Sequence, residues 1–411
     1  MKRQVVTFGC RLNNFESQVI KAQLDSVADD NVIVFNTCAV TKEAERQARQ
    51  AIRKARRENP EAKIIVTGCA AQINAEFYNS MPEVDQILGN EEKLEVKNYT
   101  SKEKLIVNDI MAVKETALHM VDSFEGNTRA FVQVQNGCNH RCTFCIIPYG
   151  RGNSRSLSVG QIVTHVQKLV DDGYKEVVFT GVDITDYGKD LPGTPTLGEM
   201  IKRVLTLVKD LPRLRLSSID VAEIDETLFE LIANEPRFMP HLHISLQSGD
   251  DMILKRMKRR HSRQNVIDFC NKVRKVRPDV AFGADIIAGF PTETDEMFLN
   301  SLNLVKEANL QYLHVFPYSA HDKTPSAKMP QVAKNIRKER AEKLRKAGHE
   351  NLNLFLDNGI GTKQKAIIEQ PLFARSENFV GIKLKSPREI GEIIEINILG
   401  KDEYNWLGEV A

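Results

Sequence analysis

The chain has 411 residues, which suggests two to four domains at about 100–200 residues each. Its 57 Lys and Arg against 55 Asp and Glu give a net charge of +2, so any affinity for nucleic acid must come from local basic patches. With 42% hydrophobic residues and no apolar run approaching about 18 residues, the composition excludes a disordered chain and a membrane span, and it predicts a cytoplasmic protein without a membrane partner.

Three strand-to-helix repeats open the chain. Predicted strands at 4–8, 32–35 and 63–66 each lead through a cysteine into a helical pattern, and these cysteines are Cys10, Cys38 and Cys69. They lie roughly 30 residues apart, the length of one repeat of a parallel sheet. Because the carboxyl ends of parallel strands meet at one edge, we expect the three cysteines to face one crevice of an α/β domain covering 1–105.

The alternation of strands and helices restarts after residues 91–125, which carry no clear pattern. A second domain is predicted over 124–356, with six parallel strands that fit an incomplete (β/α)6 barrel. Those strands lie near 130–135, 176–180, 214–218, 242–246, 281–287 and 311–316. A basic helix at 331–355 follows, and a third domain over 357–411 is predicted to be a small β-barrel. Its strands are expected at 363–369, 379–384, 390–397 and 404–410.

The seven cysteines fall into two groups of three and a single residue, Cys270. An odd number in clustered threes argues against a disulfide framework and favours thiolates that bind metal in a reducing compartment. Cys270 lies on an apolar helical stripe with Val266 and Val273, so we expect it to pack in the core.

The second group, Cys138, Cys142 and Cys145, lies on one short loop after the first barrel strand, where barrel active sites are built. Three thiolates on one loop can hold three irons of a 4Fe-4S cluster and leave the fourth iron open. The alternative is zinc, with His140 as the fourth ligand. Structural zinc usually takes its ligands from two separated pairs, which favours the cluster.

These cysteines, with Phe144 before the last one, resemble the C-x3-C-x2-C signature of radical S-adenosylmethionine enzymes. The resemblance implies that the open iron holds S-adenosylmethionine and that an electron from the cluster cleaves it to a 5′-deoxyadenosyl radical, which suits an unreactive C–H bond. It also implies that the cofactor contacts residues at the ends of later strands. With Phe144, the implied contacts are Thr180, Gly181, Asp183, Gln247, Asp285 and Gly289.

The first cysteine group extends the resemblance to nearly the whole chain. Segments 8–13, 36–41 and 67–70 resemble the N-terminal motifs of methylthiotransferases, which precede a radical core and a C-terminal TRAM barrel. The resemblance implies a second 4Fe-4S cluster whose sulfur is methylated and delivered to the substrate. It also implies a flavodoxin-like or ferredoxin-like electron donor.

Within that family, the residues around Cys10 and Cys38 are most similar to the enzymes that modify N6-threonylcarbamoyladenosine beside the tRNA anticodon. Ala39 and Pro291-Thr292-Glu293 depart from the pattern of that subgroup. The implied partner is the anticodon loop of tRNA, and the implied product carries a methylthio group at C2. The alternatives are action on isopentenyladenosine or on a ribosomal protein, or a non-catalytic RNA-binding protein stabilised by zinc.

Basic residues beside Cys10, along the helix after Cys38, in the basic run 255–263 and in the C-terminal barrel are candidates for RNA contact, because guanidinium groups can follow a phosphate backbone. The predicted contacts are Arg11, Arg46, Arg49, Arg53, Arg259, Arg260 and Arg375. For the helix that carries Arg46, a solvated face is the alternative, since its glutamates dilute the charge. A threonylcarbamoyl carboxylate would need a cation beside it, for which Arg11 and the Arg259-Arg260 pair are the candidates.

Overall fold

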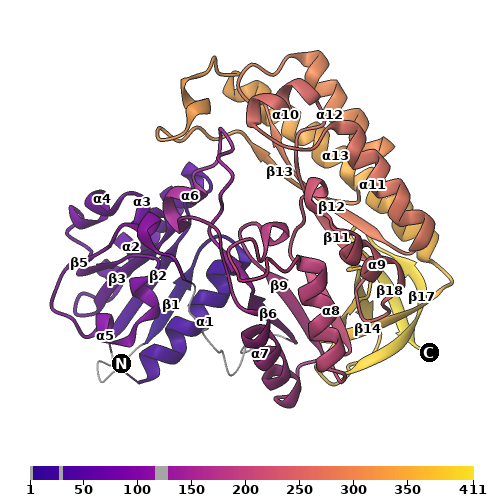
Figure 1. Ribbon diagram of the computed structural model, residues 1–411, viewed down its shortest axis with the longest axis horizontal. Coiled ribbons are helices and arrows are strands. Elements are labelled where there is room, and N and C mark those ends of the chain that lie inside the picture. Colours follow the sequence, from indigo (N-terminus) through magenta and orange to yellow (C-terminus); the bar gives the residue numbers. More distant parts are fainter. Residues whose placement is uncertain (1–2, 27–30, 116–127) are drawn as a thin grey trace.

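The structure is a computed structural model that describes residues 3–26, 31–115 and 128–411. Along the chain, an N-terminal α/β domain is followed by a large strand-and-helix region and then by a small β-barrel at the C-terminal end (Figure 1). The α/β fold class with these three parts is confirmed. The predicted start of the second domain, residue 124, lies outside the described residues.

The N-terminal domain is a parallel sheet of five strands in chain order. They are β1 (Gln4–Thr7), β2 (Val32–Thr37), β3 (Lys63–Gly68), β4 (Gln86–Leu88) and β5 (Leu105–Ile106). The first three were predicted. The last two were missed because strands of three and two residues are too short to show periodicity.

Helices cover both faces of this sheet. Ile20 of α1 (Arg11–Asp25) packs with Val34 on one face, and Ile52 of α2 (Lys42–Glu58) packs with Phe35 on the other. Thr41 caps α2 by accepting a hydrogen bond from the Ala44 amide. Shorter helical segments follow the later strands. They are α3 (Cys69–Ile73), α4 (Ala75–Asn79), η1 (Glu92–Leu94), α5 (Val96–Tyr99) and η2 (Ile110–Ala112).

The central region is an open barrel of six parallel strands. They are β6 (Arg129–Gln133), β9 (Glu176–Thr180), β10 (Arg213–Leu216), β11 (His241–Gln247), β12 (Ala281–Ala288) and β13 (Tyr312–Pro317). Two halves, β10-β9-β6 and β11-β12-β13, are joined by parallel bridges such as Ile219–Ile244. Because β6 and β13 are the edges of these halves, the barrel is incomplete, as predicted.

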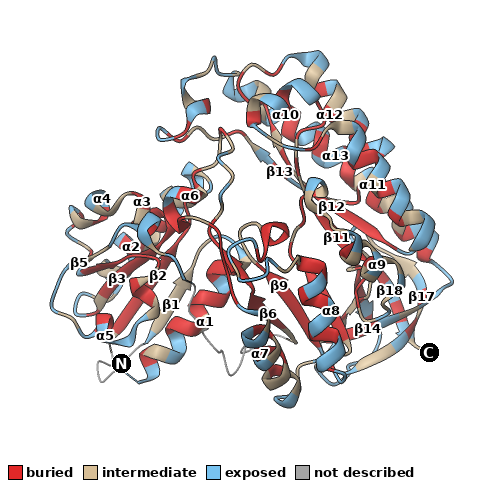
Figure 2. Ribbon diagram, viewed as in Figure 1, coloured by how far each residue is buried: buried red, intermediate tan, exposed pale blue. Residues whose placement is uncertain are grey.

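Helices and short hairpin strands connect the barrel strands. These elements are β7 (Gln135–Asn136), α6 (Ile147–Arg151), β8 (Arg155–Ser156), α7 (Val159–Asp171), α8 (Leu197–Leu207), α9 (Glu226–Asn234), α10 (Asp251–Met257), α11 (Arg263–Val276), α12 (Asp295–Glu307) and α13 (Lys334–Gly359), with η3 (Ile184–Asp186), η4 (Val221–Glu223) and η5 (Pro325–Lys328). The strands β9 and β10 are fully buried inside this shell, whereas the edge strand β13 is largely half-buried or exposed (Figure 2). Cys270 lies in the barrel core, which confirms the packing prediction. In the described part of the chain, no helix is both long and apolar enough to span a bilayer.

Helix α13 leads into a closed β-barrel in the strand order β14-β15-β16-β18-β17. Its strands are β14 (Lys363–Gln370), β15 (Phe373–Ser376), β16 (Gly381–Leu384), β17 (Ile393–Lys401) and β18 (Asn405–Val410). Four strands were predicted, and the four-residue β15 was missed. The buried Trp406 ring ties this barrel to α13 by donating to the Leu356 carbonyl at 2.8 Å.

The C-terminal barrel is seated against the amino-terminal end of the central strands. Arg213 and Arg215 both contact the buried Glu176 carboxylate, at 2.8 and 2.9 Å. The Arg215 guanidinium also donates to the Glu377 carbonyl at 3.0 Å, and the Phe379 ring stacks on His241 at 4.5 Å. The opposite, carboxyl-terminal strand ends are therefore left free for the N-terminal domain.

Candidate active site at the domain junction

The N-terminal cysteines, Cys10, Cys38 and Cys69, each follow one of three adjacent parallel strands. Cys10 caps α1, Cys38 is buried after β2, and Cys69 begins α3. Burial raises the pKa of the Cys38 thiol to about 12, and the charges of Cys69 and Cys10 add to that rise. The structure thus brings the three sulfurs to one edge of the sheet, as the strand pattern predicted.

Two of these sulfurs, those of Cys38 and Cys69, have a nitrogen donor beside them. The Val40 amide donates to the Cys38 Sγ at 3.4 Å, and the Asn90 side-chain amide lies 3.7 Å from the Cys69 Sγ. All seven cysteines are free thiols. Three converging thiols with N–H donors beside them match the donor set and hydrogen bonding of an iron-sulfur cluster.

The loop cysteines, Cys138, Cys142 and Cys145, lie between β7 and α6 and are half-buried. The Arg259 guanidinium lies 3.8 Å from the Cys142 Sγ, and the Asp183 carboxylate lies 3.6 Å from the Cys138 Sγ. Burial raises the pKa of the Cys145 thiol to about 12. This set also fits a cluster held by three thiolates from one loop.

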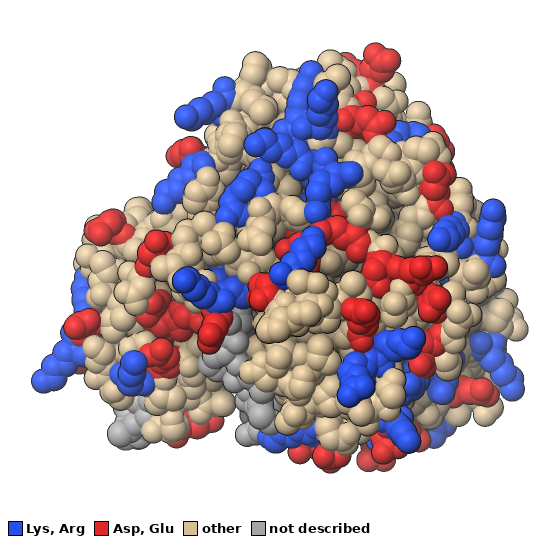
Figure 3. All heavy atoms as spheres, viewed as in Figure 1, with Lys and Arg blue, Asp and Glu red and all other residues tan. Residues whose placement is uncertain are grey.

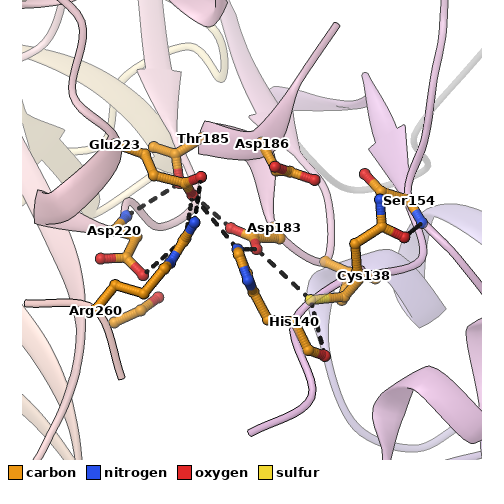
Figure 4. A network of polar contacts seen from close by, with 12 residues as sticks. Cys138, His140, Ser154, Asp183, Thr185, Asp186, Asp220, Glu223 and Arg260 are labelled. Atoms are coloured by element: carbon orange, nitrogen blue, oxygen red, sulfur yellow. Dashed lines mark hydrogen bonds and ion pairs between the residues drawn. The ribbon is translucent and has the colours of Figure 1, made fainter. Parts of the chain in front are cut away.

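The contacts of His140, which lies inside the cysteine loop, argue against its being a zinc ligand. Its Nε2 lies 3.1 Å from Asp183 and 3.7 Å from Glu223. Figure 4 shows the imidazole facing both carboxylates, with the Arg260 side chain beside it also directed at Glu223. The Arg260 guanidinium lies 2.6 Å from the Glu223 carboxylate. The neighbouring Asp183 and Glu223 carboxylates raise the pKa of His140 to about 9. The zinc alternative needed this imidazole as a fourth ligand, whereas its Nε2 is engaged by the two carboxylates.

Helix α6 joins the two cysteine sets. It starts two residues after Cys145, and its five residues span about 7.5 Å. At Gly150, near its end, a Cβ atom would come within 3.2 Å of the Cys69 Cβ, so glycine permits close packing there. The Asn90 side chain also donates to the Gly150 carbonyl. Less than two helical turns therefore separate the two sets.

A cavity of about 670 Å³ lies between the N-terminal domain and the carboxyl-terminal ends of the barrel strands. The N-terminal domain contributes Cys10, Arg11 and Cys38 to its wall. The barrel contributes residues from its strand ends and from the cysteine loop. They are Phe144, Thr180, Gly181, Gln247 and Asp285. Eight of the residues singled out from the sequence, distant along the chain, thus meet at one cavity.

Two predicted cofactor residues lie elsewhere. Asp183 belongs to the network around His140, beside Cys138. Gly289 has a φ of +70°, and a Cβ on it would meet the Arg337 side chain of α13 at 2.6 Å. Its conformational freedom therefore serves the packing of α13, and a cofactor contact at Gly289 stays a prediction.

A cluster that the sequence analysis missed lines the same cavity. His243 of β11 and His314 of β13 flank Asp285 of β12, with ring nitrogens 3.1 and 3.2 Å from the same carboxylate oxygen. Although burial raises it, the hydrogen bonds with the two histidines bring the pKa of Asp285 well below its ordinary value. The only signal in the sequence was the position of each histidine within a predicted barrel strand.

The predicted RNA contacts on α2 all have acidic partners. Arg46 pairs with Glu43 at 2.6 Å, and Arg49 lies 3.7 Å from Glu45. Arg53 lies 3.6 Å from Glu83. Contact between these arginines and RNA stays a prediction.

The other predicted RNA contacts are also held by protein groups. Arg375 pairs with Glu369 at 2.9 Å in the seat of the C-terminal barrel. Arg259 pairs with Asp220 at 2.8 Å, and Arg260 with Glu223. On the face shown in Figure 3, Lys and Arg side chains gather over the α10 end of the barrel, above a band of acidic ones. RNA contact at these residues stays a prediction as well.

Comparison with known proteins agrees with this geometry. Residues 132–305 match the radical SAM superfamily, and residues 2–89 match a group described as uncharacterized protein family UPF0004. The chain is 61% identical, over 98% of its length and 96% of the relative, to threonylcarbamoyladenosine tRNA methylthiotransferase MtaB of Rickettsia prowazekii. The protein of that name from Aquifex aeolicus is 35% identical over 97% of this chain and 100% of its own.

Among solved structures, the radical S-adenosylmethionine methyltransferase TsrM from Kitasatospora setae, solved with cobalamin and a 4Fe-4S cluster, has a TM-score of 0.56. The match covers 80% of this chain and 77% of that chain at 13% identity. At this identity the likeness shows a common fold.

Proposed function

Since the chain belongs to the threonylcarbamoyladenosine tRNA methylthiotransferase (MtaB) family, we propose that it adds a methylthio group to C2 of N6-threonylcarbamoyladenosine beside the tRNA anticodon by radical S-adenosylmethionine chemistry. The cavity whose wall includes Cys10 and Cys38 of the N-terminal domain and residues from the barrel strand ends carries this proposal. Phe144 of the cysteine loop also lines it, whereas Cys69 and the three loop cysteines are not among its lining residues. A sulfur donor and a radical source must reach the same carbon atom, and a shared cavity supplies that proximity.

Enzymes of this family use two 4Fe-4S clusters and S-adenosylmethionine. In our proposal the N-terminal cysteines hold one cluster and the loop cysteines hold the other. When bound, these groups supply the transferable sulfur and the electron that cleaves S-adenosylmethionine. The short α6 keeps the two sets of cysteine ligands close together. In this proposal the contribution of the protein is to hold the two clusters near each other.

The residues of this chain then bind and orient the cofactor. Phe144, Thr180 and Gly181 line the cavity near the loop cysteines, and Gln247 and Asp285 line it from β11 and β12. Asp183 does not line the cavity, but its carboxylate lies 3.6 Å from the Cys138 Sγ, and in our proposal it accepts a hydrogen bond from the amino group of the cofactor. These roles, and that of Gly289, are part of the proposal.

The substrate carboxylate is assigned to Arg11. Its guanidinium lines the cavity and donates to the Ser217 carbonyl at 3.2 Å, which leaves further N–H groups for a ligand. The other candidates, Arg259 and Arg260, already pair with carboxylates of the protein. A charged pair with Arg11 would distinguish the threonylcarbamoyl group from the apolar isopentenyl group.

The cellular location, the RNA contacts, the electron donor and the domain boundaries are part of the same proposal. The enzyme works in the cytoplasm, binds the anticodon loop with the predicted arginines, and receives electrons from a flavodoxin-like or ferredoxin-like protein. The free state of all seven cysteines agrees with a reducing compartment. The proposed domains remain 1–105, 124–356 and 357–411, although β5 (Leu105–Ile106) and α13 (Lys334–Gly359) each run across one of these boundaries.

The test is nucleoside mass spectrometry of tRNA from cells that make N6-threonylcarbamoyladenosine but lack its 2-methylthio derivative. Expression of the chain should produce the 2-methylthio nucleoside, and a form with the loop cysteines replaced by alanine should not. A new methylthio group on isopentenyladenosine or on a ribosomal protein instead would refute the substrate. Purified protein that is colourless and contains zinc would favour the non-catalytic alternative.

A further inference from the structure

A buried set of three charged side chains lies where the N-terminal domain meets α6. Glu16 on α1, Lys93 on η1 and Arg151 at the end of α6 have side chains only 1%, 0% and 2% exposed. Arg151 contacts both carboxylate oxygens of Glu16, at 2.7 and 2.9 Å, and the Lys93 ammonium lies 2.7 Å from the same carboxylate. None of these side chains has a role in the proposed reaction so far.

Two asparagines connect this charged set to the N-terminal cysteines. Asn13 accepts a hydrogen bond from Arg151 at 2.6 Å and donates to the carbonyls of Phe8 and Thr37, which lie just before Cys10 and Cys38. Asn90 accepts from Lys93 at 2.7 Å, and its amide lies 3.7 Å from the Cys69 Sγ. Each buried cation therefore reaches the cysteine loops through one amide.

The set carries one more positive charge than negative. Burial alone raises the pKa of Glu16, but Arg151 and Lys93 lower it to about 2, so the carboxylate is ionised. Burial lowers the pKa of Arg151, but the charges of Cys69, Glu16 and Cys10 raise it well above its ordinary value. Burial lowers the pKa of Lys93, against the attraction of Glu16 and Cys69, and its amino group donates to both Glu16 and Asn90. The two cations and one carboxylate thus lie, shielded from water, within the electrostatic reach of the cysteine sulfurs.

Stability does not explain why these charges are buried. Replacing a buried ion set with well-packed apolar side chains of similar volume is often neutral or stabilising. A role connected with the sulfurs beside it is the more direct explanation. Hydrogen bonds, net charge and solvent exposure around the thiolates are the factors that set the potential of an iron-sulfur cluster.

We propose that Glu16, Lys93 and Arg151 are positioning residues that set the reduction potential of the cluster held by the N-terminal cysteines. The inference rests on the proposed function, which places a cluster there. One electron entering that cluster adds a negative charge, and the excess of buried positive charge stabilises the reduced form. The potential is therefore higher than the same three thiolates would give without the charged set.

The two partners of one ion pair provide the test, because their removal has opposite electrostatic effects. Glu16→Gln removes a negative charge and should shift the potential upward. Lys93→Met removes a positive charge and should shift it downward. A role limited to docking the two domains predicts no shift, or a shift of one sign, since both changes break the same ion pair.

The measurement uses the full-length chain with the loop cysteines replaced by alanine, so that the N-terminal cluster is the one observed. It is titrated without oxygen, using dithionite and redox dyes, and the reduced cluster is followed by electron paramagnetic resonance. At a fixed potential near the midpoint, the ratio of reduced to oxidised cluster should rise severalfold in Glu16→Gln and fall severalfold in Lys93→Met. Equal midpoints, or shifts of the same sign, would overturn the proposal.

Glu176→Gln is the matched control. Glu176 is also a fully buried carboxylate between two cations, but it starts β9, about 13 Å along the strand from the cavity residue Thr180. It should leave the potential unchanged, and a shift equal to that of Glu16→Gln would count against the proposal. If a charge-removing variant binds no iron, Arg151→Lys and Arg151→Gln replace it. The first should keep the wild-type potential, and the second should lower it.

Failure of this inference is distinguishable from failure of the proposed function. Unshifted potentials in variants of a protein that still methylthiolates tRNA would refute the inference alone. A wild-type chain that shows no reducible iron-sulfur cluster would refute the proposed function, and this inference with it.

Discussion

Replacing Arg11 with Gln should impair the reaction with N6-threonylcarbamoyladenosine selectively. Among the described residues that line the cavity, Arg11 is the only Lys or Arg. No carboxylate of the described residues forms an ion pair with it, although the charge of Asp285 on the same wall acts to raise its pKa. A threonylcarbamoyl carboxylate entering the cavity would therefore meet this guanidinium. The glutamine side chain would keep a hydrogen-bond donor but lack the charge.

The magnitude follows from the kind of interaction. A hydrogen bond to a charged group is worth about 1.5–3 kcal/mol, and each 1.4 kcal/mol is about tenfold. The change should therefore lower kcat/KM for the carboxylate-bearing tRNA by about 10- to 150-fold. A substrate whose carboxylate is neutralised as a methyl ester should already be poor with the wild type and should decline little further with the variant.

The assay compares tRNA bearing the acid with tRNA bearing its methyl ester, in single turnovers of reconstituted full-length enzyme. Iron content and cleavage of S-adenosylmethionine are measured in parallel, because Arg11 directly follows a cluster ligand. Arg11→Lys keeps the charge and should restore most of the activity. An equal loss on both substrates with Arg11→Gln would refute the pairing of Arg11 with the carboxylate.

Three further predictions concern the clusters, the basic helix and the barrel. Alanine at any of the loop cysteines should abolish the cleavage of S-adenosylmethionine to 5′-deoxyadenosine. Alanine at any of the N-terminal cysteines should preserve this cleavage and block methylthio transfer. The reverse pattern would contradict the assignment of the two clusters. Replacing the α2 arginines Arg46, Arg49 and Arg53 with Gln should make the slope of log tRNA affinity against log salt concentration shallower. The change should be about 0.7–0.9 for each phosphate that the variant no longer neutralises, and an unchanged slope would indicate that these arginines face solvent. Burial raises the pKa of Glu176, but Arg215 and Arg213 lower it to about 2, so its ionisation stabilises the fold above a pH of about 4.5 and this stabilisation is lost as pH falls towards 2. In urea unfolding of cluster-free protein, Glu176→Gln should therefore be less stable by about 3 kcal/mol at pH 7, with a gap that narrows in acid; a gap independent of pH would argue against an ionised Glu176.

The architecture could be predicted because its signals are local. Each of the first three strands is followed within three residues by a cysteine, and the barrel strands are runs of four to eight residues, rich in apolar side chains and separated by helices. The strands that were missed include β4, β5, β8 and β15, which are only two to four residues long. Short strands of this kind depend on their neighbours in the sheet rather than on their own pattern.

The missed parts of the site depend on contacts between distant residues. Lys93 and Arg151 meet Glu16 from 77 and 135 residues away, and a charged residue carries no sign in the sequence that it will be buried. His243 and His314 could not be recognised as part of the site from the sequence, because Asp285 comes to lie between them only when β11 and β13 pair with β12. For the same reason, the sequence could not show that Arg259 and Arg260 pair with Asp220 and Glu223.

The most direct test of the central claim is product analysis with purified, reconstituted enzyme. The enzyme should be offered S-adenosylmethionine, a reductant and tRNA that carries either N6-threonylcarbamoyladenosine or isopentenyladenosine, and the nucleosides should be read by mass spectrometry. The account predicts a 2-methylthio group on the threonylcarbamoyl nucleoside, formed together with 5′-deoxyadenosine. Preferential conversion of the isopentenyl nucleoside would contradict the assigned substrate, and the absence of both products would contradict the chemistry.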